Sequence, residues 1–445
     1  MKREKIQLSS HFTYGKLVRF TLPSIIMMIF TSVYGIVDGF FVSRFAGKTP
    51  FAAVNLIMPY LMLLGAIGFM FGAGGSALIG KTLGEGKRDE AKRIFSFLVY
   101  FSFALGVLLS ALGILFLPAV AMALGASGEM LSDCVVYGRI ILLALPFFLM
   151  QYEFQSFFIT AEKPKLGLAV TVASGVANML LDALLVGIIP LGLVGAAVAT
   201  AVSQFVGGAL PLIYFARKNN SLLSLCKSEF LGRALLRTVA NGSSELMSNI
   251  SMSAVSMLYN AQLMKYAGED GVAAYGVLMY VGMIFVAVFI GYSVGTAPVV
   301  SYHFGSGNRV ELKGLFRKSM TLILSSSVCM VILSLLLSYP LSLLFVGYDA
   351  ELLSLTVRGF LFFSLSFLFS GVAIYGSAFF TALNNGLISA LISFLRTLVF
   401  QVLAVLLLPL LWGIDGVWSS IIAAELFAAA ITALFIFGSR KKYGY

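Results

Sequence analysis

The sequence predicts an all-α polytopic membrane protein, with twelve transmembrane helices in two pseudo-symmetric six-helix bundles. Its composition is the first reason. Apolar residues make up 60% of the 445 residues and charged residues only 11%, whereas about 25% of the residues in a soluble domain are charged. The second reason is that apolar runs of about 18 residues or more recur along the whole chain, each long enough to cross a bilayer as a helix. The third is an internal repeat that relates the two halves of the chain.

The apolar runs are separated by short polar or helix-breaking stretches. The first run follows residues 1–16 and lacks a small-residue cleavage site, so we expect a retained span and not a removed signal peptide. Pairs such as Lys163-Pro164 and Trp412-Gly413 interrupt later runs, as proline and glycine do between helices. The twelve expected spans cover residues 17–43, 51–82, 94–120, 134–160, 166–189, 191–216, 234–264, 271–303, 315–345, 352–382, 386–410 and 412–438.

Lysine and arginine gather in alternate loops. One set of loops and ends holds 24 of these residues and the other set holds 5, while Arg396 lies inside a span. Basic loops remain on the cytoplasmic side of a membrane. We therefore expect an even number of spans in a cell membrane, with both termini in the cytoplasm. The same distribution accounts for the net charge of +11 without a nucleic-acid partner.

The two halves of the chain align at a constant offset of 221 residues. Gly84-Glu85-Gly86 falls on Gly305-Ser306-Gly307, and Thr160-Ala161 falls on Thr381-Ala382. An even number of spans in each half makes the repeats parallel, and transporters of this kind place their substrate between the halves. A channel or an enzyme could also contain a repeat. The predicted domains are an N-lobe at residues 1–216, a cytoplasmic linker at 217–233 and a C-lobe at 234–445.

Carboxyl groups inside the expected spans are the main functional candidates, because a charge at the bilayer centre costs at least about 2.5 kcal/mol. Asn178 precedes Asp182 by four residues, which places both side chains on one face of the fifth span. Thr200 on the next span can add a hydroxyl group, and Asp38 on the first span a second carboxylate. These oxygen groups suit a proton relay or a hard cation such as Na⁺. If the carboxylates face each other, their repulsion favours uptake of a proton or a cation.

Three further polar residues are accessory candidates for this site: Tyr34, Glu153 and Glu245. We interpret Glu425, in the last span, as structural. Pro23 lies one or two turns into the first span, where proline removes a backbone hydrogen bond and permits a kink. It is a candidate moving part, with a static kink as the alternative.

The predicted cation site belongs to the N-terminal half alone. Under the repeat offset, Asp38 falls on Tyr259 and Asp182 falls on Leu403. The second half therefore does not repeat the acidic pair.

Other familiar sites are not supported. Cys134, Cys226 and Cys329 are odd in number and far apart, so they indicate neither a disulfide framework nor a metal site. His11 and His303 are too few and too widely separated for a zinc site, and we interpret both as packing or loop residues.

A nucleotide site is also not expected. The octad Gly75–Thr82 matches the P-loop pattern, but a working P-loop follows a strand in a soluble α/β fold. Here the octad ends an apolar helix and is rich in small residues, which permit close helix packing in lipid.

Taken together, the motifs resemble those of the multidrug and toxic compound extrusion (MATE) transporters along essentially the whole chain. The marks of this resemblance are the context of Asp38, the segment Gly80–Gly86 with its echo at Ser301–Gly307, the pair Asn178-x-x-x-Asp182, and the segment Gly192–Gln204.

The resemblance implies two six-helix bundles around a cavity that opens alternately to each side, and export of organic, often cationic, drugs driven by entry of Na⁺ or H⁺. It implies a cation site at residues that match Asp38, Asn178, Asp182 and Thr200. It also implies that Pro23 matches a proline in the first helix of the family, where bending of the helix accompanies protonation. Some members of the family have acidic residues deep in the C-lobe helices, whereas this chain has mainly Glu245 there. This difference leaves the coupling ion undecided.

Three alternatives remain distinct from a multidrug antiporter. A flippase for lipid-linked sugars or other amphiphiles usually lines its cavity with several basic residues, whereas only Arg396 lies inside a span here. An intramembrane enzyme needs a nucleophile or metal constellation, and a passive channel needs no paired carboxylates in one half. We therefore expect a monomeric transporter of drug-like molecules in contact with membrane lipids, with no nucleotide, no cofactor and no enzymatic activity.

Overall fold

The computed structural model describes residues 6–46 and 48–445. Lys2, Arg3 and Lys5, which belong to the basic set predicted to be cytoplasmic, lie outside the described residues. The described chain is almost entirely helical and contains no β-strand. Its α-helices are α1 (Tyr14–Phe41), α2 (Lys48–Gly84), α3 (Arg88–Ala123), α4 (Gly128–Leu143), α5 (Leu145–Thr160), α6 (Pro164–Asp182), α7 (Gly192–Ala216), α8 (Gly232–Gly305), α9 (Arg309–Val346), α10 (Ala350–Ala382), α11 (Gly386–Phe394), α12 (Phe400–Trp412) and α13 (Ile414–Tyr443). Three short π-helices are η1 (Val42–Ala46), η2 (Ala183–Ile188) and η3 (Leu395–Val399).

The helices are long and apolar enough to account for the twelve predicted spans. Within the described residues, ten helices pass this test, and α4 with α5 forms an eleventh span that bends by 56°. Helix α8 contributes two spans, because its 74 residues fold back at Gly268, where φ is 63° and ψ is −150°. A positive φ is readily adopted by glycine, which has no Cβ. The predicted count of twelve is therefore consistent with the structure.

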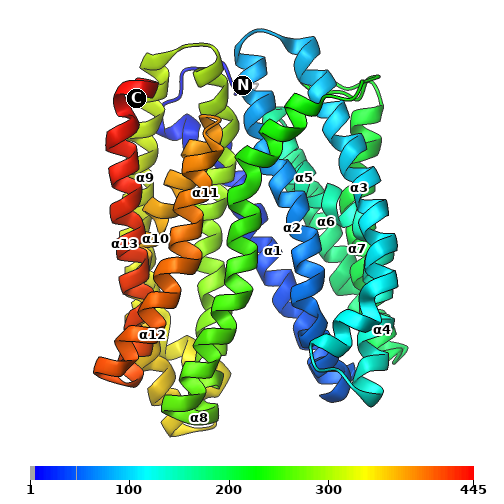
Figure 1. Ribbon diagram of the computed structural model, residues 1–445, viewed down its shortest axis with the longest axis vertical. Helices are drawn as coiled ribbons and strands as arrows, with labels where there is room; N and C mark the ends of the chain where they lie inside the picture. The colour runs from blue at the N-terminus through cyan, green and yellow to red at the C-terminus, as the bar shows by residue number, and fades with distance from the viewer. Residues whose placement is uncertain (1–5, 47) are drawn as a thin grey trace.

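The helices gather into two groups that meet at one end of the molecule. Figure 1 shows α9–α13 on one side and α3–α7 on the other, with α2 and α8 between them. Both termini lie at the same end, and the ribbons of the two groups diverge away from it (Figure 1). In lipid, backbone polar groups must be bonded within the protein, which is why each apolar segment forms a helix.

Helices α2 and α8, which lie between the two groups, contact each other through glycine residues at their C-terminal ends. A Cβ added to Gly84 would overlap the carbonyl oxygen of Tyr302, and one added to Gly305 would overlap that of Lys81. The second contact is the first one shifted by 221 residues with the partners exchanged. We call this pair of contacts the glycine seam. Its reciprocity agrees with the repeat found in the sequence, because an interface around a two-fold axis repeats each contact in both directions.

A second layer of contacts follows the same rule. A Cβ on Gly74 of α2 would lie 2.8 Å from the backbone nitrogen of Gly242, and one on Gly295 of α8 would lie 3.0 Å from the Cβ of Thr21 in α1. Shifting the first pair by 221 residues gives the second. The start of α8 therefore packs on α2 as α1 packs on the end of α8. The P-loop-like octad lies wholly within α2, where its glycines serve helix packing.

An N-terminal segment ties the two groups together beside the seam. The backbone N–H of Leu8 donates to Glu162 Oε1 over 2.8 Å, in the connection between α5 and α6. The N–H of Phe12 donates to Glu311 Oε1 in α9 over 2.9 Å, and His11 Nδ1 lies 2.6 Å from Glu311 Oε2. The side chains of Leu8 and Phe12 are fully buried. We call residues 6–13 the N-terminal clasp.

The glycine seam predicts opposite effects for two glycine-to-alanine changes. Gly84→Ala should lower the thermal unfolding midpoint, because its methyl group must displace the backbone at Tyr302. Gly276→Ala in α8 meets nothing within 4 Å and should be neutral or stabilising, since alanine is favoured over glycine in a helix by about 1 kcal/mol. Thermal unfolding of the detergent-purified protein checks both. A Gly84→Ala protein as stable as Gly276→Ala would contradict the seam.

The clasp predicts a change in amide exchange. Glu311→Gln should speed hydrogen–deuterium exchange in the peptide that contains Phe12 by about tenfold or more, because a hydrogen bond to a charged acceptor contributes about 1.5–3 kcal/mol. Glu351→Gln, an exposed acidic residue in the first turn of α10, is the matched control and should leave that peptide unchanged. Equal exchange in the two variants would show that the carboxylate of Glu311 does not hold the segment.

Candidate functional site

Two of the acidic residues predicted from sequence stand where an α-helix gives way to a π-helix. Asp38 lies four residues before η1, and its carbonyl oxygen accepts from the backbone N–H of Val42. Asp182 is the last residue of α6 and directly precedes η2. The segments η1 and η2 contact each other. Short π-helices are rare and often mark functional positions in a helix. Here they bring the ends of α1 and α6 together.

The structure brings together all four residues that the sequence predicted as a cation site. Thr200 Oγ1 on α7 donates to Asp38 Oδ1 over 3.4 Å, and Asn178 Nδ2 on α6 donates to Thr200 Oγ1 over 3.5 Å. The carboxylate of Asp182 interacts electrostatically with that of Asp38. Asp182 is fully buried, Asn178 is 1% exposed and Asp38 is 9% exposed. The hydrogen bonds are long, so these oxygens are loosely held.

The acidic pair has no counter-charge among the described residues. No lysine, arginine or histidine described in the structure forms an ion pair with Asp38 or Asp182. Neither carboxylate oxygen of Asp182 receives a hydrogen bond from a described donor, and the same holds for Asn178 Oδ1. A buried charge without a partner is costly. The site therefore holds uncompensated negative charge, which a proton or a hard cation bound to these oxygens can reduce.

Two tyrosine residues border the acidic pair. Tyr34 on α1, an accessory candidate from the sequence, interacts with Asp38 and with Gln151 of α5. Tyr137 on α4 was not predicted. It is fully buried, it interacts with Asp38, Asp182 and Thr200, and its hydroxyl group has no described partner within hydrogen-bond distance. A single tyrosine in an apolar span gives no sequence signal of its own.

The other two accessory candidates lie elsewhere. Glu153 on α5 faces α2 and α3: a Cβ on Gly72 would lie 3.1 Å from its Cα, and Ser102 of α3 is the polar group near its carboxylate. Neither oxygen of Glu153 has a described partner. Glu245 on α8 interacts with Arg396 of η3, and both residues belong to the C-terminal half. The structure therefore does not place Glu153 or Glu245 with the acidic pair.

The C-terminal half fills the equivalent region with internally bonded groups. Tyr259, which the offset aligns with Asp38, donates to Gln401 Oε1 over 2.7 Å. Arg396 in η3 donates through Nε to both carboxylate oxygens of Glu425, over 2.9 and 3.1 Å. This ion pair agrees with the structural interpretation of Glu425. The acidic pair without a described counter-charge lies in the N-terminal half, and its binding of a cation stays a prediction.

Pro23 lies in a stretch of α1 that packs against α8. A Cβ on Gly291 of α8 would lie 2.5 Å from the Cα of Ile25, and one on Gly295 would lie 3.0 Å from the Cβ of Thr21. Helix α1 continues through Pro23 to Phe41. One helix thus joins the acidic pair to α8.

Both halves of the chain are similar in sequence to a known protein family. The family model MatE matches residues 23–184 and 246–406, one match in each half of the chain. The multidrug export protein MepA of Staphylococcus haemolyticus is 26% identical over 438 residues, a match that covers 96% of this chain and 94% of that protein. MepA of Staphylococcus aureus strain MRSA252 is 25% identical over 426 residues, covering 94% and 92%.

Solved structures share the fold over the full length. A structure described as the outward-facing conformation of a multidrug resistance MATE family transporter of the MOP superfamily has a TM-score of 0.93 at 22% identity, covering 100% of this chain and 99% of that one. A MATE structure in complex with MaL6 has a TM-score of 0.92 at 21% identity, covering 99% of each chain. The two matches to the MatE model span most of the sequence, and the chain therefore belongs to the MatE family, that of the MATE membrane transporters.

Proposed function

We propose that this protein is a secondary active exporter that exchanges drug-like organic compounds, often cationic, for H⁺ or Na⁺. The observation that supports this most is the buried acidic pair Asp38 and Asp182 in the N-terminal half, which has no counter-charge among the described residues. The full-length similarity to multidrug export proteins supports the class of cargo. The protein then acts as a monomer in the cell membrane, and the ion gradient supplies the energy in place of a nucleotide.

The proposed orientation has both termini in the cytoplasm, as the distribution of lysine and arginine favours. The glycine seam and the clasp lie at the end where the termini lie (Figure 1). This conformation is then closed toward the cytoplasm. The similarity to a structure described as outward-facing supports that assignment.

Coupling follows from the path of α1. An entering cation reduces the negative charge of the pair formed by Asp38 and Asp182, which weakens their repulsion and lets α1 and α6 approach each other. Because α1 also packs on Gly291 and Gly295 of α8 around Pro23, a shift of α1 changes the contact between the two groups of helices. A ligand can shift a conformational equilibrium only through different affinity for its two states, and the distance between the carboxylates supplies that difference.

The ion pair of Arg396 favours a cationic or neutral cargo over a pyrophosphate lipid. Its Nε already donates to both oxygens of Glu425, so its charge is satisfied within the protein. A flippase for anionic amphiphiles needs basic groups that are free to bind phosphate. Stimulated lipid translocation in vesicles would support that second candidate.

Loss of one carboxylate should abolish coupled transport. We expect Asp38→Asn in proteoliposomes to lose at least about 90% of the movement of a fluorescent organic cation driven by a pH or Na⁺ gradient, because the pair no longer needs the entering ion. Asp270→Asn, an exposed carboxylate on α8, is the control and should transport normally. The gradient that drives transport identifies the ion. Full coupled transport by Asp38→Asn would contradict the proposal.

The same pair predicts a stability effect without transport. Asp182→Asn should unfold at a higher temperature than the wild type in the absence of the coupling ion, since it relieves the repulsion with Asp38. In the wild type, adding the ion at about 100 times its dissociation constant should stabilise the fold by about 2.7 kcal/mol, and Asp182→Asn should lose that gain. Thermal unfolding across pH and Na⁺ concentration measures both. Equal stabilisation of the two proteins would remove Asp182 from the site.

A further inference from the structure

One face of α6 is polar from Thr171 to the last residue of the helix, Asp182. Thr171, Ser174, Asn178 and Asp182 follow one another at intervals of three or four residues, the spacing of a single helix face, and all four are buried. Eleven residues separate Thr171 from Asp182, which is about 16 Å along the axis. The polar face therefore leads away from the acidic pair toward Pro164, where α6 begins.

Neighbouring helices extend this face with polar groups. Gln151 Nε2 on α5 donates to Ser174 Oγ over 3.1 Å. Ser174 Oγ donates to the carbonyl oxygen of Ser203 on α7 over 2.8 Å, and Ser203 Oγ donates to that of Ser174 over 2.9 Å. Gln204 Oε1 is buried without a described partner. We call this run of groups between α5, α6 and α7 the polar file.

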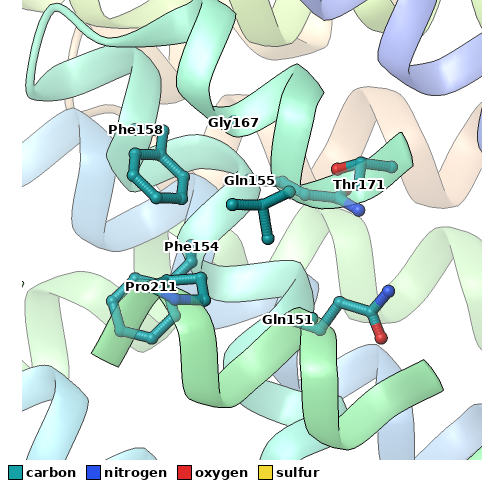
Figure 2. Close-up of a pocket in the computed structure, with 9 residues that line it drawn as sticks. Gln151, Phe154, Gln155, Phe158, Gly167, Thr171 and Pro211 are labelled. Atoms are coloured by element: carbon teal, nitrogen blue, oxygen red, sulfur yellow. The ribbon is translucent and has the colours of Figure 1, made fainter. Parts of the chain in front are cut away.

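A small cavity continues the file beyond Ser174. Its volume is about 10 Å³, and it is lined by nine residues of the three helices. Figure 2 shows Gln151 and Gln155 of α5 and Thr171 of α6 at this cavity. Gln155 is 4% exposed, and neither its amide nitrogen nor its amide oxygen has a described partner. Polar cavities of this size hold a single water molecule. An unsatisfied buried amide favours such a water.

The file approaches the surface near the start of α6 and the end of α7. Pro211 lines the small cavity, and the adjacent residues Leu210 and Tyr214 line a second, open pocket of about 470 Å³. The basic residues Lys163 and Arg217 border that pocket. Both stand at span ends, Lys163 directly before α6 and Arg217 directly after α7.

We propose that the polar file is the route by which the coupling ion, a proton, passes from the acidic pair through the interior of the N-terminal half to the end of the molecule that carries both termini. This rests on the proposed antiport. In the release step, the O–H bond of one protonated carboxyl group of the pair breaks, and its proton joins a water oxygen of the file. Waters pass the charge on, and one proton leaves to the bulk solvent at the open pocket.

The chemistry of the file favours a proton over Na⁺. A cavity of about 10 Å³ holds one water, whereas Na⁺ needs several oxygen ligands at once. Hydroxyl groups and water relay protons without moving far. The positive potential of Lys163 and Arg217 at the pocket lowers the local concentration of protons, which favours release there over entry. The glycine seam stays closed during this step, so cargo and proton use separate paths.

Two apolar substitutions test the route while the acidic pair stays intact. Gln155→Leu combined with Thr171→Val removes two of the three polar side chains that line the cavity at nearly constant volume, and it keeps Gln151 with its bond to Ser174. We expect this variant to bind the ion from the outer side, with the same pH-dependent gain in thermal stability as wild type, but to lose at least about 90% of proton release measured with a pH-sensitive dye trapped inside vesicles. The single variant Thr171→Ser keeps the hydroxyl group and should release protons as the wild type does.

The matched control is Thr356→Val in α10, where the threonine is also buried and its hydroxyl group donates to the backbone carbonyl oxygen of Leu352. It should release protons at the wild-type rate. Normal proton release by the double variant would overturn the route. So would a driving ion identified as Na⁺ with no proton movement. If Asp38→Asn also transports normally, the proposed antiport fails, and the two failures are thereby told apart.

Discussion

Close approach of backbone to backbone between α2 and α8 is the constraint on which the arrangement of the two halves depends. At Gly84 and Gly305 the partner carbonyl oxygens occupy the space of a Cβ, so only glycine permits the contact. Small residues of this kind replace the hydrophobic effect as the basis of helix association in lipid. The reciprocal pairing fixes a two-fold relation, and the positions of α1 against α8 and of α8 against α2 follow from it.

The two halves repeat each other in packing but differ in chemistry, because only the N-terminal half contains the acidic pair without a described counter-charge. The halves repeat their packing, yet the residue equivalent to Asp38 is Tyr259, which bonds Gln401. In the C-terminal half, Arg396 forms an ion pair with Glu425. The N-terminal half leaves Asp182 without a counter-charge among the described residues. The proposed response to an ion is therefore concentrated in α1, α6 and α7.

The sequence predicted those features that depend on the chemistry of single residues or on long patterns. Twelve spans, the repeat and the grouping of Asp38, Asn178, Asp182 and Thr200 were all accessible, because a carboxylate in an apolar helix is expensive and therefore informative. The polar file was not predicted. Serine, threonine and glutamine are tolerated in membrane helices, and their meaning depends on tertiary pairs such as Ser174 with Ser203.

Other limits of the sequence have equally plain causes. Tyr137 lies beside the site because α4 packs against α7, which periodicity does not reveal. The accessory candidates Glu153 and Glu245 resemble Asp38 in sequence, since each is an acid in an apolar run. Their surroundings differ: the carboxylate of Glu153 lies near Ser102 and that of Glu245 near Arg396. Which face of a helix meets which neighbour decides the role, and a single sequence does not contain that information.

The N-terminal clasp has a consequence for the rate at which the molecule leaves this conformation. Its anchors, Glu162 and Glu311, belong to different groups of helices, so any motion that parts them at this end breaks two hydrogen bonds to carboxylates. At about 1.5–3 kcal/mol each, these bonds add roughly 3–6 kcal/mol to the barrier if both break before the transition state. That corresponds to a slowing of about 10² to 10⁴. Eight residues outside every membrane span can thus control how fast the helices inside the membrane change conformation.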